Sequence, residues 1–393
     1  MLSQRQLFLR HVAQTSTSPL MLEIVKAEGI YLIDINGKKY IDLIAGISVS
    51  NLGHCHPNVV AAIKKQTEEY MHLMVYGEYV QSPQVRLAAL LAAQTPGIDS
   101  YYFVNSGAEA IEGCIKLARR YTSRKKIFAF RNAYHGSTNG ALSLMSSEEL
   151  TEPFKPLLPE IEFLNFNEVR DLDKIDFATA GVFLEVVQGE AGAIPGNTEF
   201  LKQLQQKCRS TGALLIVDEI QTGYGRTGSL FAFMKHSLQP DIIALAKGMG
   251  GGMPLGAFAA PLKIMQSLSH NPVLGHITTF GGNPVCCAAG LATLETLLSS
   301  ELISTVNEKE KIIRDKIKHH SILNITGEGL LLGIQFESAE MNHKVIAKCI
   351  ENGIITDWFL FAPDKMRIAP PLIISNDELA YACYMILKSI DEV

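Results

Sequence analysis

Short apolar strands alternate with helix-like or irregular stretches from about Leu87 onward. The strand candidates are residues 101–104, 127–130, 181–187, 214–218 and 242–246. Near-continuous apolar strands separated by helices indicate an α/β fold, in which a largely parallel sheet is covered on both faces. Such sheets bind ligands at the carboxyl ends of their strands. We therefore expect a site where Asn105, Asp218 and Lys247 follow their strands.

The two ends of the chain differ from this central region. A hairpin is expected in residues 29–42, turning at Asn36-Gly37. A long helix is predicted over 284–298, followed beyond residue 305 by a helix, strands at 323–327 and 330–336, a helix at 342–351 and a final helix from 376. Because 393 residues exceed one ordinary core, we predict a large domain over 46–300 and a smaller α+β domain formed by 1–45 and 301–393.

Charge and cysteine usage exclude several classes of protein. The net charge is −5, from 35 basic and 40 acidic residues without a basic stripe, so nucleic acid is not expected as a partner. The seven cysteines are scattered and form no CxxC pair, which favours a reducing compartment over a disulfide framework or a zinc site. No apolar stretch approaches the roughly 18 residues of a membrane span. We expect a cytoplasmic protein with neither a membrane nor a metal partner.

Lys247 lies at the end of an apolar strand and runs into the glycine-rich stretch GMGGGMPLG. Burying its ammonium group costs several kcal/mol and lowers its pKa, which makes the amine a nucleophile able to form a Schiff base. Alternatively, the lysine only caps the strand and reaches water. Asp218 ends the strand LLIVD, where a carboxylate needs a cation. Its partner is either an arginine or the protonated ring nitrogen of a cofactor.

Two predicted helix starts follow strands or loops. Ser106 and Glu109 have the spacing of a capping box, and Gly107 lets the backbone approach a bound phosphate closely; an ordinary capped helix is the alternative. Asn283 is a predicted N-cap with Pro284 at the first helical position. The threonines before it, at 278 and 279, would add hydroxyl donors to an anion. Tyr134 and His135 follow another strand, where an aromatic ring would stack on a planar ligand.

Two motifs resemble binding sites but are not predicted to be functional. The glycines at 223, 225 and 228 spell GxGxxG, but they do not sit at the strand's end and no helix is expected to open across them. A dinucleotide site is therefore not predicted. The sequence HisCysHis at 54–56 has no second cluster at zinc spacing, so a turn before Pro57 is favoured over a metal site.

Taken in order, these motifs resemble the class III (subgroup II) pyridoxal-phosphate aminotransferases, the fold-type I family of acetylornithine, ornithine and 4-aminobutyrate aminotransferases. The resemblance spans nearly the whole chain, through YLIDINGKKYIDLIAGISVSNLGHCHP, NSGAEAIE, YHGST, EVVQGEAG, VDEIQTGYGRTG, ALAKGMGGGMPLG, TTFGGNP and MRIAPPL. It implies a fold-type I enzyme whose large domain binds pyridoxal phosphate, and a homodimer with shared active sites.

The resemblance also implies a role for each cofactor-binding residue. Lys247 would carry pyridoxal phosphate as a Schiff base and later act as general base, with Asp218 on the ring nitrogen. The other implied cofactor contacts are Ser106, Gly107 and Ala108 at the phosphate, Tyr134 and Ile220 on the two ring faces, Gln221 at the phenolic oxygen, His135 nearby, and Thr279 reaching the phosphate of the neighbouring subunit.

The implied substrates are an amine or ω-amino acid and a 2-oxo acid, most plausibly 2-oxoglutarate. Arg367 resembles the family arginine that grips the α-carboxylate of glutamate, and Glu190 the carboxylate that neutralises it for the other substrate. Thr278 and Ser137 complete the predicted substrate contacts. The alternative within the same family is an aminomutase, a racemase or a decarboxylase.

Ser137 departs from the family pattern, because acetylornithine and ornithine enzymes carry arginine at this place after His-Gly or its equivalent. Serine cannot form the two charge-assisted bonds that a guanidinium gives a second carboxylate. The donor is therefore either acetylornithine, an amine lacking that carboxylate, or one whose carboxylate is held elsewhere, for example in the stretch containing Tyr76, Glu78 and Arg86.

Overall fold

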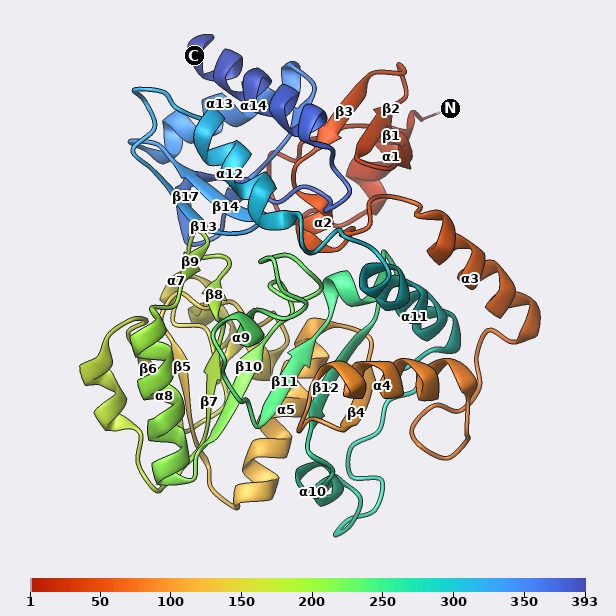
Figure 1. Ribbon diagram of the computed structural model, residues 1–393, viewed down its shortest axis with the longest axis vertical. Helices are drawn as coiled ribbons and strands as arrows, with labels where there is room; N and C mark the ends of the chain where they lie inside the picture. Colours follow the sequence, from red (N-terminus) through yellow and green to blue (C-terminus); the bar gives the residue numbers. More distant parts are fainter. Residues whose placement is uncertain (1) are drawn as a thin grey trace.

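The computed structural model describes residues 2–393 and places a seven-stranded sheet at the centre of the lower layer in Figure 1. Its strands run in the order β4 (Ser100–Val104), β12 (Gly256–Ala260), β11 (Ile242–Leu245), β10 (Leu214–Asp218), β7 (Thr179–Leu184), β5 (Lys126–Phe130) and β6 (Ile161–Leu164). Only β12 runs against its neighbours; the other adjacent pairs are parallel. The predicted, mostly parallel mixed sheet is confirmed.

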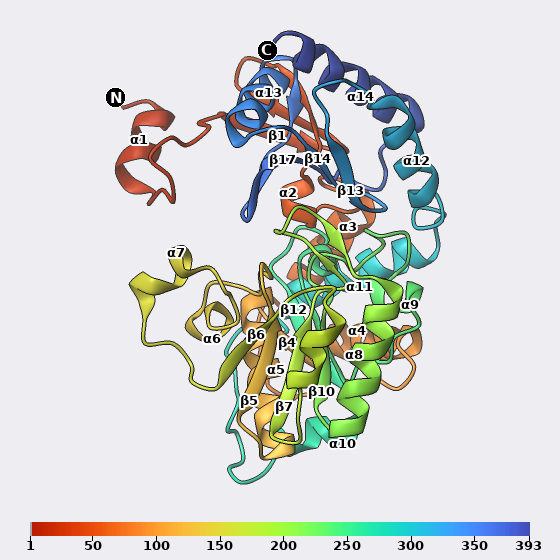
Figure 2. The same cartoon turned by 90° about the vertical axis from the view of Figure 1, so that its left-hand side faces the viewer.

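Both faces of this sheet are covered because its strands are apolar on both sides. Phe183 and Ile216 pack in one cluster with α5 (Gly107–Thr122), while Leu215 and Val217 pack in another with α8 (Thr198–Thr211). Successive strand residues point to opposite faces, so the two helices lie on opposite sides of the sheet, as Figure 2 shows. The predicted helix over 284–298 is α11 (Pro284–Leu298), with Asn283 as its N-cap.

Two four-stranded sheets lie above the central one in Figure 1. The first contains β1 (Ile24–Glu28), β2 (Tyr31–Asp34), β3 (Lys39–Asp42) and β15 (Ile354–Ile355), and the second β13 (Asn324–Glu328), β14 (Leu331–Gln335), β17 (Ala362–Ile368) and β16 (Trp358–Phe359). The hairpin of β2 and β3 confirms the predicted turn at Asn36-Gly37. β15 pairs with β3, which joins the two chain ends in one sheet. The domain limits given above stay a proposal, which this pairing supports.

The remaining elements complete the description. The longer helices are α3 (Pro57–Glu69), α4 (Ser82–Gln94), α12 (Val306–Lys316), α13 (Ala339–Glu351) and α14 (Asn376–Asp391). The shorter elements are α1 (Gln4–His11), α2 (Ala45–Ser48), α6 (Asn139–Leu142), α7 (Glu148–Thr151), α9 (Ala232–Lys235), α10 (Leu262–Met265), η1 (Glu152–Phe154), η2 (Val169–Lys174), η3 (Lys247–Gly250), η4 (Gln266–Leu268), β8 (Val187–Gln188) and β9 (Ile194–Pro195). Figure 2 shows α1 standing apart from the rest of the fold.

The strand expected over 181–187 is not continuous. It ends at Leu184, and the chain turns at Glu185 before β8 pairs with β9. At this point the Glu185 carboxylate accepts hydrogen bonds from the backbone N–H groups of Tyr134 and Gly189. The buried carboxylate is thereby satisfied by two loops.

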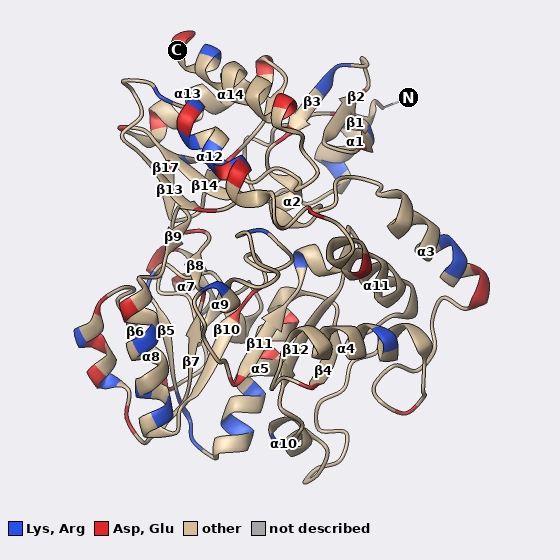
Figure 3. Cartoon of the chain, in the orientation of Figure 1, with Lys and Arg blue, Asp and Glu red and all other residues tan. Residues whose placement is uncertain are grey.

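Charged side chains of both signs are interspersed along the helices in the view of Figure 3, for example on α3 and α8. None of the helices formed by residues 2–393 is long and apolar enough to cross a membrane. Over the same residues, no group of three or more His, Cys, Asp or Glu side chains is arranged to hold a metal ion.

Candidate active site

A cavity of about 690 Å³ opens at the carboxyl ends of β4, β10 and β11. It lies where the sequence predicts a site, because Asn105, Asp218 and Lys247 all line it. The other predicted site residues that line it are Ser106, Gly107, Ala108, Tyr134, His135, Ser137, Ile220 and Gln221. β12 is antiparallel to both β4 and β11, so β4 and β11 run in the same direction and end at the same edge.

β11 ends at Leu245, and Ala246 separates it from Lys247, which is the first residue of η3. Its φ of 48° is unusual for a residue other than glycine, and such backbone strain clusters at functional sites. Burial is the largest influence on its amine and lowers the pKa, and the nearby Arg367 guanidinium acts in the same direction. The negative charges of Glu190, Asp218 and Glu185 oppose this fall without reversing it. The amine is therefore poised to lose its proton more readily than an ordinary lysine.

Asp218 is bound by His135 rather than by an arginine. The His135 Nδ1 atom lies 2.7 Å from Asp218 Oδ2, and Asp218 Oδ1 accepts a hydrogen bond of 2.9 Å from the Ile220 N–H. Burial opposes the charged imidazole, but the hydrogen bond to Asp218 and the charges of Asp218 and Glu185 outweigh it, so the His135 pKa is raised. The His135 Nε2 atom is buried and has no partner among the described residues.

The start of α5 approaches the cavity closely. Ser106 caps the helix by accepting a hydrogen bond from the Glu109 N–H at 3.2 Å. The predicted capping box is only half formed, because the Glu109 carboxylate turns to the N–H and side chain of Asn105 instead of the Ser106 N–H. A Cβ on Gly107 would lie 2.9 Å from the Cδ1 of Ile220, so the absence of a side chain lets Ile220 pack closely against this turn.

The loop after β5 brings Tyr134 and Ser137 together. Their hydroxyl oxygens are 3.0 Å apart, so Ser137 is engaged with the aromatic residue predicted to stack on the ring. Gln221 also lines the cavity, and its side-chain nitrogen is buried without a partner in the described chain. A Cβ on Gly189 would lie 1.8 Å from the Gln221 Oε1 atom. The absence of a Cβ at Gly189 therefore leaves room for the Gln221 amide.

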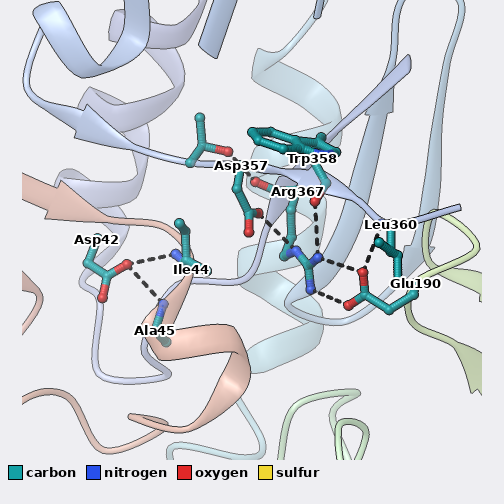
Figure 4. A network of polar contacts seen from close by, with 9 residues as sticks. Asp42, Ile44, Ala45, Glu190, Asp357, Trp358, Leu360 and Arg367 are labelled. Carbon is teal, nitrogen blue, oxygen red and sulfur yellow. Dashed lines mark hydrogen bonds and ion pairs between the residues drawn. The ribbon is translucent and has the colours of Figure 1, made fainter. Parts of the chain in front are cut away.

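Arg367 and Glu190 form a two-pronged ion pair (Figure 4). Neither residue lines the Lys247 cavity, but both charges act on the Lys247 amine. Arg367 Nη1 and Nη2 donate to Glu190 Oε1 and Oε2 at 2.9 and 3.0 Å. Asp357 accepts a third bond from Arg367 Nε at 2.9 Å. Burial, supported by the charge of Glu190, raises the Asp357 pKa to about 6 although Arg367 opposes this. Burial would also raise the pKa of Glu190, but Arg367 reverses that effect and leaves it lowered.

Thr278 and Thr279 do not line the Lys247 cavity of their own chain. Thr278 accepts a hydrogen bond from the Gly281 N–H at 3.2 Å, and Thr279 is exposed. In the stretch named as an alternative carboxylate holder, Arg86 pairs with Glu295 at 3.1 Å, and Tyr76 lines a separate hollow. The structure of one chain therefore does not bring these residues to Lys247.

The two motifs that were expected not to bind a metal or a dinucleotide are the histidines at 54 and 56 and the glycines at 223, 225 and 228. His54 pairs with Asp42 at 2.8 Å, and His56 caps α3 by accepting from the Asn58 N–H. No helix spans the glycines at 223, 225 and 228. Both structural interpretations agree with this geometry.

Three features of the site were missed from the sequence. Glu185, the single charge within the apolar run GVFLEVV, is a signal that could have been used. The pairing of His135 with Asp218 has no local sequence signal, because the two residues are 83 positions apart. Asp357 carries no sequence signal of its own, and the strand that holds Arg367, β17, was not predicted.

Comparison with known proteins gives consistent matches over nearly the whole chain. The family model described as "Aminotransferase class-III" matches residues 12–390. The chain is 39% identical over 380 residues to an acetylornithine aminotransferase of Archaeoglobus fulgidus, covering 96% of this chain and 98% of that protein. It is 40% identical over 376 residues to an acetylornithine aminotransferase of Methanopyrus kandleri, covering 95% and 94%.

Solved structures agree with this. An ornithine aminotransferase from Toxoplasma gondii superposes with a TM-score of 0.92 at 31% identity, covering 100% of this chain and 96% of that one. An (S)-enantioselective omega-transaminase from Thermomicrobium roseum superposes with a TM-score of 0.91 at 28% identity, covering 98% and 97%. The fold-type I architecture expected from the sequence is confirmed.

Proposed function

This chain belongs to the class III aminotransferases and is a pyridoxal-phosphate-dependent transaminase, and we propose that it takes its amino group from an amine or ω-amino acid related to acetylornithine, ornithine or 4-aminobutyrate. The acceptor in this proposal is 2-oxoglutarate. The observation that carries it is the Arg367–Glu190 pair, whose charges act on the Lys247 amine, because a guanidinium that can exchange carboxylate partners suits two unlike substrates. The relatives are named as transaminases, which favours transamination over an aminomutase, racemase or decarboxylase reaction.

The residues around the cavity fit pyridoxal phosphate. The side-chain nitrogens of Gln221 and His135 are buried without partners in the described chain, and buried polar atoms of this kind need a ligand or water. Asp218 is a buried carboxylate facing the same space, and Lys247 has a lowered pKa. A ring with a protonatable nitrogen, a phenolic oxygen and an aldehyde meets the needs of Asp218, Gln221 and Lys247.

In the proposed arrangement Lys247 holds the cofactor covalently and Asp218, held by His135, keeps its ring nitrogen protonated. Bound pyridoxal phosphate supplies an electron sink for the carbanion formed when a substrate C–H bond breaks. The remaining proposed contacts are Ser106, Gly107 and Ala108 at the phosphate, Tyr134 and Ile220 on the ring faces and Gln221 at the phenolic oxygen. The exposed Thr279 is proposed to reach the partner's phosphate.

Lys247 has a second proposed task as the proton carrier. Its Nζ would take the proton from the reacting carbon of the substrate and hold it for return as the product forms. A lowered pKa suits this task, because a general base must be unprotonated at the working pH. Ala246 and Lys247 lie just beyond the regular strand, and both line the cavity.

Arg367 and Glu190 are proposed to separate the two half-reactions. With an amine donor, Glu190 remains on Arg367 and the guanidinium is neutralised. With glutamate or 2-oxoglutarate, the substrate carboxylate replaces Glu190 on the Nη1 and Nη2 atoms. The bonds of 2.9 and 3.0 Å that Nη1 and Nη2 donate to Glu190 support this, because they match the two oxygens of one carboxylate.

The homodimer and the cytoplasmic location are also parts of this proposal. Thr279 is exposed and outside the Lys247 cavity, while apolar side chains near it are exposed as well, including Ile277 and Phe280. A second copy of the chain would cover them and bring Thr279 to its site. The seven free cysteines, six of them buried, agree with a reducing compartment.

The donor is tested by a panel of amines with 2-oxoglutarate and with pyruvate, comparing the parent with Ser137→Arg. A second carboxylate on the donor gains a two-pronged partner in the variant, so kcat/KM for acetylornithine should rise about tenfold or more. Ser137→Lys is the matched control, because it adds a charge without the planar fork. No gain with arginine would mean that the second carboxylate is selected elsewhere.

A further inference from the structure

Arg367 binds two carboxylates at once, on two different edges of its guanidinium (Figure 4). Glu190 takes the Nη1–Nη2 edge. Asp357 takes Nε at 2.9 Å, and the Trp358 carbonyl accepts a further bond from Nη2 at 3.2 Å. The guanidinium is almost fully buried, with a residue exposure of 2%. The proposed function uses only the first of these edges.

The second edge is held by the sheet in which Arg367 lies. The Arg367 N–H donates to the Asp357 carbonyl at 2.8 Å, so backbone and side chain join the same two residues. Phe359 lies against the flat face of the guanidinium, with the Arg367 Cζ atom 4.5 Å from its ring centre. Trp358 and Phe359 form β16, the strand next to β17. These contacts therefore come from β16, β17 and the residue that precedes β16.

Glu190 comes from a different part of the fold. It follows β8 in the loop that leads to β9 and reaches Arg367 across 177 positions of sequence. When Glu190 leaves, the contacts to Asp357, Trp358 and Phe359 do not have to break. A guanidinium has five N–H donors in one plane, so fixing its Nε edge also fixes where its Nη1–Nη2 edge points.

We propose that Asp357 is a positioning residue, which keeps the Nη1–Nη2 edge of Arg367 aimed at the substrate carboxylate while Glu190 and substrate exchange. This inference rests on the proposed role of Arg367. Asp357 acts through its hydrogen bond to Nε and does not touch the substrate. The affinity for the carboxylate then depends on that bond, whereas the affinity for a donor amine without a carboxylate does not.

The test measures binding of glutarate, a dicarboxylate with neither an amino nor an oxo group, to the cofactor-loaded enzyme by titration calorimetry. The fluorescence of Trp358 gives a second measurement of binding, since Trp358 is the only tryptophan of the chain and is 48% exposed. Asp357→Ala removes the acceptor, and we expect glutarate to bind at least about tenfold more weakly. Asp357→Asn keeps an oxygen acceptor and should stay within about threefold of the parent.

Asp364→Asn is the matched control, because Asp364 lies on the same strand, β17, and bonds to Gln335 instead of Arg367. It should bind glutarate as the parent does. In steady-state assays Asp357→Ala should raise KM for glutamate and 2-oxoglutarate and leave KM for a carboxylate-free amine donor unchanged. This split separates positioning from a general loss of structure.

Three outcomes would overturn the inference: unchanged glutarate binding by Asp357→Ala, equal weakening by the alanine and asparagine variants, or equal weakening of the carboxylate-free amine. Arg367→Lys separates this result from the proposed function. If the lysine variant binds glutarate as the parent does, the role of Arg367 itself is wrong. If it binds weakly and Asp357→Ala does not, only the role of Asp357 is wrong.

Discussion

A side chain added at Gly189 would disturb the proposed contact between Gln221 and the cofactor. A Cβ there would lie 1.8 Å from Gln221 Oε1. Gly189→Ala should therefore displace the Gln221 amide and weaken retention of the cofactor about tenfold. The measurement is the amount of cofactor released during dialysis, followed by its absorbance. Gly250→Ala is the control, because its nearest neighbour would be Leu255 Cβ at 3.4 Å. Equal retention by both variants would contradict the predicted role of Gly189.

Glu219 gives a prediction for pH. Burial raises the pKa of its carboxyl to about 7, although Thr222 and the Phe233 N–H donate to it. The unfolded chain would have a carboxyl pKa of about 4.3, so between these values the folded state binds more protons. The free energy of unfolding then falls as the pH rises from about 4.5 to about 7.

Glu219→Gln removes this titration while keeping one acceptor for the Phe233 N–H. The melting temperature of the parent should fall more than that of the variant between pH 5 and pH 8. Glu295→Gln, at an exposed position paired with Arg86, should follow the parent. Parallel curves for the parent and Glu219→Gln would show that Glu219 does not titrate in this interval.

At the scale of elements, the packing of α5 on the central sheet depends on Gly113. A Cβ there would lie 2.2 Å from the Phe258 ring, which belongs to β12. Gly113→Ala would gain about 1 kcal/mol of helix propensity but would overpack the core at a cost of about 1–3 kcal/mol. We expect a lower melting temperature, and a recovery when Phe258→Leu is added. A stable single variant would contradict this packing.

How well elements could be predicted from the sequence depended on their local pattern. The helix α11 was predicted correctly because Asn283 and Pro284 form a strong start, and β10 because LLIVD is continuously apolar. β12 was missed because GAFAA is rich in small residues and lacks β-branched ones. β17 was missed because APDKMRI mixes charges with apolar residues; Lys365 and Arg367 are buried in it.

Some parts of the candidate site could be predicted from the sequence and others could not. Residues at strand ends could be placed by topology alone, since parallel strands bring Asp218 and Lys247 to one edge. Contacts such as His135 with Asp218, or Asp357 with Arg367, depend on which loops and strands become neighbours. Local sequence does not contain that information, because the partners come from separately formed elements.

For the whole molecule, the proposal requires two chains for each complete site. Val80, which is 93% exposed, the apolar side chains at 273, 274, 277 and 280, and Thr279 are all exposed in one chain. We predict that mixing Lys247→Ala subunits with Thr279→Ala subunits restores activity. In a random mixture half the dimers are mixed and each has one intact site, so about a quarter of all sites would work. Mixed samples no more active than the separate variants would mean that sites are not shared.

Lys247 is proposed to hold the cofactor of the transaminase, and borohydride reduction followed by peptide mass analysis tests this directly. Reduction should fix the cofactor on the peptide containing Lys247, since this amine has a lowered pKa and lines the cavity with Asp218. Incubation with L-glutamate before reduction should leave that peptide largely unmodified, because transamination releases the lysine. An unmodified Lys247 without glutamate, or a modification that glutamate does not change, would contradict the account.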